Sequence, residues 1–424
     1  MIIPSIDLSG GQTVQWIGGR DHALDAGDPR PIAERFGLVS EIAVVDLDAA
    51  LGRGSNAALI QGLLPIASCR VGGGIRDVET AIRWLDAGAS KVVLGTAAVP
   101  EVLKCLPAAR VIAALDAYEG EVVVEGWRKP TGRGIVERMQ ELEGLVGGFL
   151  VTFVEQEGRM QGTRLDQVEA LVQAAGKARL TIAGGVTTCQ EIATLDAQGA
   201  DAQIGMALYT GRLELGDAIA AVLRSDRPDG LWSTIIVDEH GCALGLAYSS
   251  RESLAEAVRT RCGVYQSRSR GLWVKGKTSG ALQELLRIDV DCDRDVLRFT
   301  VRQKGAGFCH NDTWTCFGPS GGIPALSRRL SERVADAPEG SYTRRLLTDP
   351  TLLSAKLAEE ASELAQARSR EEVVGEASDV LYFTLVALAR AGASLSEVEA
   401  ELDRRALKVT RRPGEAKPRA KEGE

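Results

Sequence analysis

The spacing of apolar and polar positions changes along this chain. Over residues 1–223, short apolar runs suited to buried strands alternate with stretches of helical character, which is typical of βα units on a parallel sheet. After a polar boundary at 224–230, short strand-like runs dominate to about 320. Residues 350–392 instead repeat apolar and charged positions at helical spacing. The expected fold class is multidomain: a β/α region, a small β-rich region and an all-α region.

These changes in the spacing of apolar positions predict domains at 1–223, 224–335 and 336–412, followed by a disordered tail at 413–424. The N-terminus lacks the pattern of a signal peptide, and no apolar run approaches the length of a membrane span. Eight cysteines without a disulfide-like framework fit a reducing compartment, so we expect a cytoplasmic protein. The net charge of −8 argues against a nucleic-acid scaffold.

The first region repeats itself. The segment around Asp7 returns around Asp116, and the glycine-rich segment at 71–77 returns at 182–188, each at an offset of about 110 residues. Two further pairs of segments share nearly the same offset. A unit of four βα elements that is copied once predicts an eight-stranded (β/α)8 barrel with approximate twofold symmetry.

In such a barrel, the active site lies at the C-terminal ends of the strands. Asp7 and Asp116 end the first and fifth strands, so we expect them to face each other across the mouth. Paired glycine-rich turns could bring backbone N–H groups close to a phosphate at each end of a substrate, although tight turns alone also use glycine. The glycines in these turns are Gly73, Gly74, Gly95, Gly184, Gly185 and Gly205.

Residues 1–222 resemble phosphoribosylformimino-aminoimidazole carboxamide ribotide isomerase. The resemblance runs through IPSIDL, VDLDAA, VGGGIRD, VVLGTAAV, LDAYEGEVVVEGW, AGGV and IGMALYTGR. It implies an Amadori rearrangement of an aminoaldose to an aminoketose, which needs a proton donor at the ribose ring and a base at C2. By resemblance, Asp7 is the base, Asp116 the acid and Thr152 a polar helper.

The barrel also departs from this family. The family usually has an arginine after the first strand's turn, where this chain has Val14-Gln15-Trp16, and Thr152 is followed by Phe153 instead of an acidic residue. Some fused relatives carry a first domain that has lost its chemistry. An inactive barrel that serves as a binding or scaffold module therefore stays an alternative.

Carboxylates and thiols alternate in the second region, at Asp291, Cys292, Asp293 and Asp295. On an extended strand, the three carboxylates would share one face and Cys292 would point to the other. Oxygen ligands suit Mg²⁺ or Ca²⁺, whereas sulfur suits Zn²⁺. Together with Cys309 and Cys316, Cys292 would give a catalytic zinc its three protein ligands; with His310 as the fourth ligand, the zinc would be structural.

Most of 230–318 resembles phosphoribosyl-AMP cyclohydrolase, through LGLAYSSRESL, GVYQSRSRGLWVKGKTSG, LLRIDVDCDRD and GFCHNDTWTCFG. The resemblance implies that Zn²⁺ activates a water that opens the adenine ring, and that His310 shuttles the proton. It also implies an obligate homodimer, because the aspartate-flanked cysteine comes from the second subunit. The implied residues are Cys292, Cys309 and Cys316 for zinc, Asp291, Asp293 and Asp295 for magnesium, and Ser267 and Arg268 for the substrate phosphate.

One motif in this region is misleading. Residues 271–278 fit the GxxxxGK[ST] pattern of nucleotide-binding loops, but the apolar strand that must precede such a loop is missing. We therefore expect no nucleotide loop here. Lys277 and Ala281 stand where the cyclohydrolase family usually has Glu and Asn, and neither receives a role.

The helical region places acidic residues at helical spacing. Glu360 and Glu363 share one helix face, as do Glu376 and Asp379, so two antiparallel helices could direct four carboxylates at one Mg²⁺. A solvated charged face is the plainer alternative, but the apolar run that follows Asp379 should be buried. Residues 338–412 resemble phosphoribosyl-ATP pyrophosphohydrolase, which implies Mg²⁺-assisted hydrolysis between the α and β phosphates.

The three resemblances name consecutive steps of histidine biosynthesis. They predict a multifunctional enzyme that acts on small phosphoribosyl nucleotides with Zn²⁺ and Mg²⁺. The alternative is a bifunctional cyclohydrolase and pyrophosphohydrolase with an inactive barrel.

Overall fold

The computed structural model describes residues 1–411 except 20, 125, 126 and 128, so the predicted tail at 413–424 lies outside the described residues. The chain divides into two compact units. One contains Met1–Ile236, Leu246–Arg302 and the segment from Leu407; the other contains Val237–Gly245 and Gln303–Ala406. Of the described helices, none combines the length and apolar character that a membrane crossing needs. The predicted domain boundaries stay predictions.

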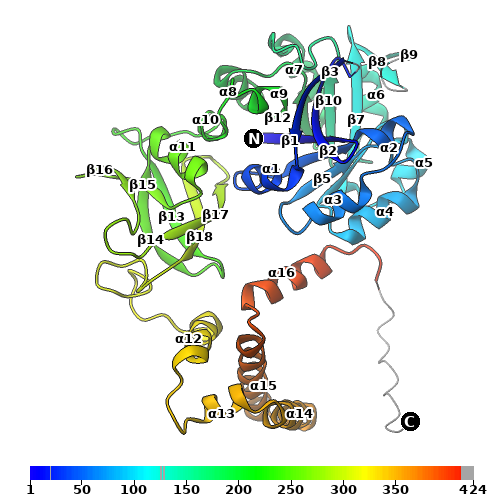
Figure 1. The fold of residues 1–424 in the computed structure, drawn as a ribbon. Helices are drawn as coiled ribbons and strands as arrows, with labels where there is room; N and C mark the ends of the chain where they lie inside the picture. The colour runs from blue at the N-terminus through cyan, green and yellow to red at the C-terminus, as the bar shows by residue number, and fades with distance from the viewer. Residues whose placement is uncertain (20, 125–126, 128, 412–424) are drawn as a thin grey trace, which may run out of the picture. The chain divides into compact units, whose positions relative to one another are not determined.

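Eight parallel strands close into a barrel, as the repeat predicted (Figure 1). The strands pair in chain order, and the eighth strand closes on the first. Valine, isoleucine and other apolar residues fill them because both faces of a parallel strand are covered. The barrel strands are β1 (Ile2–Ser9), β4 (Ile42–Asp46), β5 (Cys69–Gly72), β6 (Lys91–Leu94), β7 (Val111–Tyr118), β10 (Gly148–Phe153), β11 (Arg179–Ala183) and β12 (Ala200–Ile204).

The approximate twofold symmetry is visible at the mouth. An antiparallel hairpin extends the first barrel strand, and another extends the fifth. The first hairpin comprises β2 (Gln12–Ile17) and β3 (Asp21–Gly27); the second comprises β8 (Glu121–Val124) and β9 (Lys129–Gly134). Because Asp7 and Asp116 each lie where such a hairpin begins, the duplication places both aspartates in equivalent positions.

Helices follow the barrel strands, and several begin at a side-chain cap. Asp77 caps α4 by accepting a hydrogen bond from the N–H of Thr80, and Thr188 forms a capping box with Glu191 on α8. The helices of this region are α1 (Pro29–Phe36), α2 (Leu47–Leu51), α3 (Ala57–Leu63), α4 (Val78–Ala87), α5 (Pro100–Leu103), α6 (Ile135–Glu141), α7 (Val168–Ala175), α8 (Cys189–Ala197), α9 (Met206–Tyr209) and α10 (Leu215–Ala220).

The second region is β-rich, as predicted. Four strands form one sheet in the order β14-β13-β18-β17, and β15 pairs with β16 in a separate antiparallel hairpin. Residues 275–280 form turns after β16, and no helix follows, which agrees with the rejection of a nucleotide loop. The elements are β13 (Trp232–Asp238), β14 (Ala243–Ser249), α11 (Arg251–Thr260), β15 (Val264–Ser267), β16 (Gly271–Val274), β17 (Gln283–Val290) and β18 (Val296–Gln303).

One expectation about this region is wrong. Residues 291–295 do not form an extended strand, because β17 ends at Val290 and β18 begins at Val296. Asp291 Oδ1 accepts hydrogen bonds from the N–H groups of Asp295 and Val296, both at 3.1 Å. A short acidic side chain that bonds nearby backbone N–H groups favours a turn over a strand. Arg294 also adopts a left-handed backbone conformation there, with φ of 72°.

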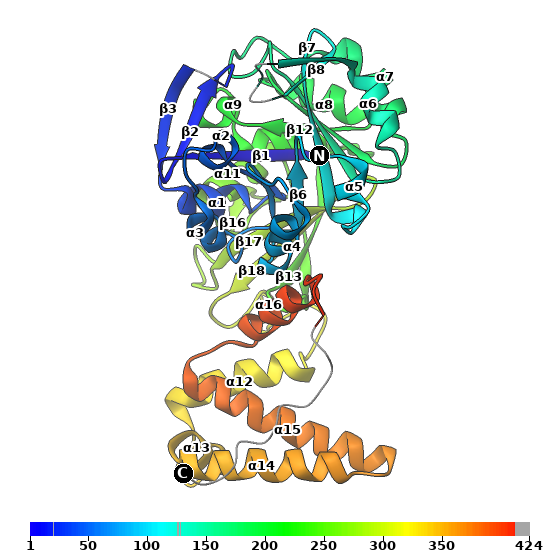
Figure 2. The ribbon, with the colours of Figure 1, turned by 90° about the vertical axis from the view of Figure 1, so that its right-hand side faces the viewer.

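The third region is helical. Figure 2 shows α14 and α15 running side by side, and the short connection between them makes the two helices antiparallel. Asp349 caps α14, and Ser369 forms a capping box at the start of α15. Leu353, Phe383 and Val386 are buried in the core between the helices. The helices are α12 (Gly322–Asp336), α13 (Tyr342–Thr348), α14 (Pro350–Gln366), α15 (Arg370–Ala391) and α16 (Leu395–Ala406).

Candidate active sites

The barrel mouth holds the two predicted aspartates, each with a polar partner. Gln15 Nε2 donates a hydrogen bond of 3.2 Å to Asp7 Oδ2. Thr152 lies directly beside Asp116 on the neighbouring strand, and its hydroxyl is hydrogen-bonded to that carboxyl group. Gln15 stands in the segment where the sequence departs from the isomerase pattern. Because its amide is bonded to the Asp7 carboxyl group, this departure changes the environment of Asp7.

Burial shifts the acidity of both aspartates. It raises the pKa of Asp7 to about 6, although the hydrogen bond from Gln15 acts in the opposite direction. Burial also raises the pKa of Asp116, and hydrogen bonds from Trp127 and Thr152 oppose this shift. Both carboxyl groups can therefore exchange protons closer to neutral pH than ordinary aspartates can.

Glu157 is a third acidic residue at this mouth, and it was not among the residues predicted from the sequence. Burial, followed by the negative charges of Asp7 and Asp116, raises the pKa of Glu157 to about 8. The loop that carries Glu157 is fixed to the first hairpin, because the Gly18 N–H donates to the Glu157 carbonyl at 3.0 Å. The sequence did contain a signal for this residue: Glu157 lies in the loop that follows the sixth barrel strand, where active-site residues of such barrels are found.

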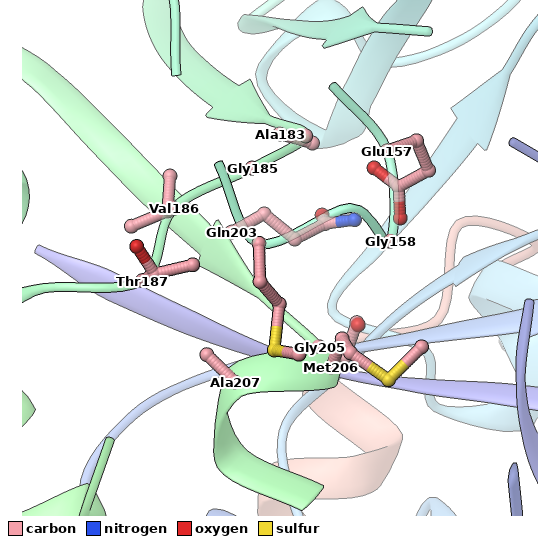
Figure 3. A pocket seen from close by; sticks show the side chains of 13 residues that line it. Glu157, Gly158, Ala183, Gly185, Val186, Thr187, Gln203, Gly205, Met206 and Ala207 are labelled. Atoms are coloured by element: carbon pink, nitrogen blue, oxygen red, sulfur yellow. The ribbon is translucent and has the colours of Figure 1, made fainter. Parts of the chain in front are cut away.

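A small hollow of about 30 Å³ lies beside Glu157 (Figure 3). Gly184, Gly185 and Gly205 line it, together with Thr187, and no Lys or Arg occurs among its described lining residues. A phosphate in this hollow would meet backbone N–H groups and hydroxyl groups. The glycines also have a packing role, since a Cβ at Gly184 would lie 2.6 Å from the Phe153 carbonyl oxygen.

A second hollow, of about 360 Å³, lies beside Asp116, and its lining includes Gly95 and Thr96. Gly95 needs no unusual backbone conformation, and a Cβ there would meet no atom within 4 Å. Neither packing nor backbone strain therefore requires a glycine at this position, which is compatible with the predicted close approach of a phosphate. A Cβ at Gly73 or Gly74 would overlap the backbone of Asp46 or Ala49, so these two glycines also have a packing role, and their part in phosphate binding stays a prediction.

The predicted magnesium ligands of the β-rich region come together despite lying in a turn. Carboxylate oxygens of Asp291, Asp293 and Asp295 lie within 4.8 Å of one another. Burial, followed by the charges of Asp293 and Asp291, raises the pKa of Asp295. Mutual repulsion of this kind is relieved when a hard cation binds, so the donor set fits Mg²⁺. Magnesium binding itself stays a prediction.

Two of the three predicted zinc thiols lie in one loop after β18. The pKa of the Cys309 thiol is lowered by the N–H of Asn311 first, and also by the Thr313 and Cys316 side chains. A thiol that is readily deprotonated and lies beside a second thiol fits a soft metal such as Zn²⁺. His310 Nδ1 lies 4.0 Å from Cys309 Sγ. Cys292 is exposed in the other unit, and its part in zinc binding stays a prediction.

The predicted phosphate contacts of the β-rich region have partners within the protein. The Arg268 guanidinium lies 5.3 Å from the centre of the Tyr248 ring, and that of Arg227 lies 4.5 Å from the same ring. Ser267 Oγ accepts a hydrogen bond from the Arg270 N–H at 3.3 Å. These contacts order the loop, and a role in phosphate binding stays a prediction.

In the helical region, oxygens of Glu360, Glu363 and Glu376 lie within 4.8 Å of one another. Glu360 is buried, and Lys356 Nζ binds it at 2.9 Å. Burial, followed by the charge of Glu363, raises the pKa of Glu376, to which Asp379 and Glu360 also contribute. Asp379 lies outside the 4.8 Å group among the described residues. Three carboxylate ligands close together fit a divalent cation such as Mg²⁺.

Comparison with known proteins agrees with this division of sites. A family model described as histidine biosynthesis protein matches residues 1–214. The chain belongs to this family. Two further models match downstream: phosphoribosyl-AMP cyclohydrolase over 245–318 and phosphoribosyl-ATP pyrophosphohydrolase over 323–406. The three matches confirm the three resemblances in their order along the chain.

Individual relatives cover different shares of this chain. A histidine biosynthesis trifunctional protein of Neurospora crassa is 39% identical over 81% of this chain and 38% of its own length. A bifunctional relative from Schizosaccharomyces pombe is 53% identical over 49% of each chain. An imidazole-4-carboxamide isomerase of Methanosphaerula palustris is 36% identical over 52% of this chain and 99% of its own length. The chain thus spans less than half the length of the first two relatives.

Proposed function

We propose that this chain catalyses three steps of histidine biosynthesis. The helical region would remove pyrophosphate from phosphoribosyl-ATP, the β-rich region would open the adenine ring of phosphoribosyl-AMP, and the barrel would isomerise the resulting aminoaldose. The three family matches, in order, support the combination. The observation that carries the barrel's activity is the cluster of Asp7, Asp116 and Glu157 at its mouth. The protein would work in the cytoplasm.

At the barrel, the pKa values of the acidic residues indicate which residue acts as base and which as acid. With a pKa of about 6, Asp7 is mostly ionised at pH 7 and suits removal of the proton at C2. Asp116 would donate the proton that opens the ribose ring, and Thr152 would orient it. Glu157, with a pKa of about 8, is mostly protonated at pH 7; it could pass its proton to Asp116 and take up the proton that Asp7 removed, which restores all three groups. The hollows on either side would hold the two phosphates.

At the β-rich region, Cys309 and Cys316 would bind zinc together with Cys292 of a second copy, which would make the protein a homodimer. Bound Zn²⁺ would lower the pKa of a water molecule, so that hydroxide is available near neutral pH. Asp291, Asp293 and Asp295 would hold Mg²⁺ near the substrate phosphate, with Ser267 and Arg268 as further contacts. His310, next to Cys309, would accept and return the proton.

At the helical region, Glu360, Glu363 and Glu376 would bind Mg²⁺, and Asp379 would complete the acidic site. Bound Mg²⁺ would neutralise charge on the pyrophosphate and lower the pKa of the attacking water. Lys356 keeps Glu359 and Glu360 ordered through bonds of 2.8 and 2.9 Å, which would preserve the ligand geometry.

The deciding experiment feeds purified full-length protein with phosphoribosyl-ATP, Mg²⁺ and Zn²⁺ and identifies the compound that accumulates. The proposal expects the aminoketose. Accumulation of the aminoaldose, with no turnover when that compound is supplied directly, would mean that the barrel is a binding or scaffold module. Accumulation of phosphoribosyl-AMP would contradict the role given to the β-rich region.

A further inference from the structure

Trp314 lies between the two thiols of the loop after β18, and its contacts hold that loop closed. Its carbonyl accepts a hydrogen bond from the Phe308 N–H at 3.1 Å, and the Cys309 N–H donates to the Thr313 carbonyl at 3.1 Å. Cys316, two residues after Trp314, donates its N–H to the Leu244 carbonyl on β14 at 2.8 Å. The position of Trp314 is thus coupled by backbone bonds to the positions of both cysteines.

The indole N–H of Trp314 is anchored on one side by Asp238, at the end of β13. Trp314 Nε1 donates to Asp238 Oδ2 at 3.0 Å. Asp238 is only 1% exposed, and its other oxygen accepts the N–H groups of His240 and Cys242 at 3.1 and 2.9 Å. Because these bonds fix the carboxylate, Asp238 is a rigid acceptor for the indole.

On its ring face, Trp314 meets Arg328 from α12. The guanidinium carbon of Arg328 lies 3.8 Å from the centre of the Trp314 ring, which is the geometry of a close cation–π contact. Arg328 Nη2 also donates a hydrogen bond of 2.7 Å to Ser320 Oγ, which lies just before the start of α12. This bond fixes the position of the guanidinium group. Residues 311–313 are exposed, whereas Trp314 is half-buried and contacts both Asp238 and Arg328.

We propose that Arg328 is a positioning residue for the Cys309 and Cys316 thiols. Helix α12 falls within the pyrophosphohydrolase match at 323–406, whereas the thiols fall within the cyclohydrolase match at 245–318. Through Arg328 and Trp314, the first helix of one catalytic region thus holds the metal-binding loop of the other. The inference rests on the proposed zinc site, and it adds a residue that lies outside the cyclohydrolase match. All of these residues belong to one compact unit.

The test compares Arg328→Met with Arg329→Met in the full-length protein. Arg329 is the exposed neighbour on the same helix, so its loss controls for helix charge and propensity. Zinc transfer to a chromogenic chelator should be roughly ten-fold faster in Arg328→Met, as when residues that support metal ligands are removed. Arg328→Lys, which keeps a cation for the ring, should recover part of the difference.

A second readout needs no metal. In apoprotein, alkylation of Cys309 and Cys316 by iodoacetamide, followed by mass spectrometry at each cysteine, should be several-fold faster in Arg328→Met. Alkylation of Cys105, which is exposed and lies in the barrel region, should not change. Release of pyrophosphate from phosphoribosyl-ATP should match that of Arg329→Met, because Arg328 lies outside that site. If Arg328→Met melts early, Arg328→Gln tests the same contact.

The outcomes separate the two hypotheses. Equal zinc transfer and equal alkylation in the Arg328 and Arg329 variants, with wild-type protein that retains zinc, would overturn the positioning role alone. Wild-type protein that retains no zinc when its thiols are reduced would overturn the proposed zinc site and this inference together. Faster alkylation at Cys309 and Cys316 without a change at Cys105 supports the inference directly.

Discussion

Thr152 and Asp116 occupy paired positions on adjacent strands of the barrel, and the Thr152 hydroxyl is hydrogen-bonded to the Asp116 carboxyl group. The bond works against burial, which raises the pKa of Asp116. Together with Trp127, Thr152 therefore lowers the pKa of the carboxyl group that is proposed as the acid of the isomerisation.

Replacing Thr152 with valine removes this hydrogen bond while keeping the shape of the side chain. The pKa of Asp116 should rise further, and isomerisation should fall by about ten- to a hundred-fold at pH 7. Thr152→Ser, which keeps a hydroxyl, should retain most of the activity. Steady-state rates for both variants decide the matter, and a valine variant as active as wild type would remove Thr152 from the mechanism.

Asp7→Asn should abolish isomerisation and spare the other two activities, since an amide cannot take up the proton. The same change should stabilise the barrel. A folded-state pKa of about 6, raised above the ordinary 3.8, means that the folded protein binds the proton more tightly, so stability falls as pH rises from 4 to 6. Removing this ionisation should add at most about 3 kcal/mol at pH 8.

Thermal denaturation at pH 4 and pH 8 measures this effect, and the gain should appear only at the higher pH. Asp25→Asn is the matched control, because Asp25 is an exposed aspartate on the first hairpin. A uniform loss of all three activities in Asp7→Asn would contradict independent sites.

Glu157 should determine how the rate of isomerisation falls at alkaline pH. With a pKa of about 8, it loses its proton as pH rises through that value, whereas Asp7 becomes an active base above about pH 6. The dependence of kcat/KM on pH should therefore be bell-shaped, with limbs near these two values. Glu157→Gln should flatten the alkaline limb and leave the acid limb in place. An unchanged alkaline limb would show that another group is responsible.

The sites differ in how many of their residues could be predicted from the sequence. The internal repeat was enough to place Asp7 and Asp116, because barrel topology carries equivalent strand ends to the mouth. Glu157 was missed because its raised pKa depends on a loop that folds back to bond Gly18, which no spacing rule contains. In 291–295, alternation predicted a strand, but local hydrogen bonds to Asp291 made a turn.

For the zinc site, Cys309→Ser should lower the zinc content and reduce ring opening of phosphoribosyl-AMP by at least about a hundred-fold, since one thiolate ligand is lost. Cys105→Ser is the control, because this exposed cysteine lies outside the loop. Metal analysis and ring-opening rates on the same samples provide the measurement. Normal turnover in a zinc-free Cys309→Ser protein would refute the role of the metal.

Glu376 tests whether the acidic group between α14 and α15 is a metal site or a charged surface. Because its pKa is raised by burial first and then by Glu363, the carboxylates repel one another until a cation binds. Mg²⁺ should therefore raise the melting temperature of the helical region in wild type, and this gain should shrink in Glu376→Gln. Pyrophosphate release should fall by about a hundred-fold or more.

Glu371→Gln is the matched control for this experiment, since Glu371 is exposed in the first turn of the same helix. It should keep both the response to Mg²⁺ and the release of pyrophosphate. If Glu376→Gln released pyrophosphate at the wild-type rate with the same dependence on Mg²⁺, then proximity of the three carboxylates would reflect helix packing alone. A loss of both effects in Glu376→Gln only would connect the geometry of Glu360, Glu363 and Glu376 to catalysis.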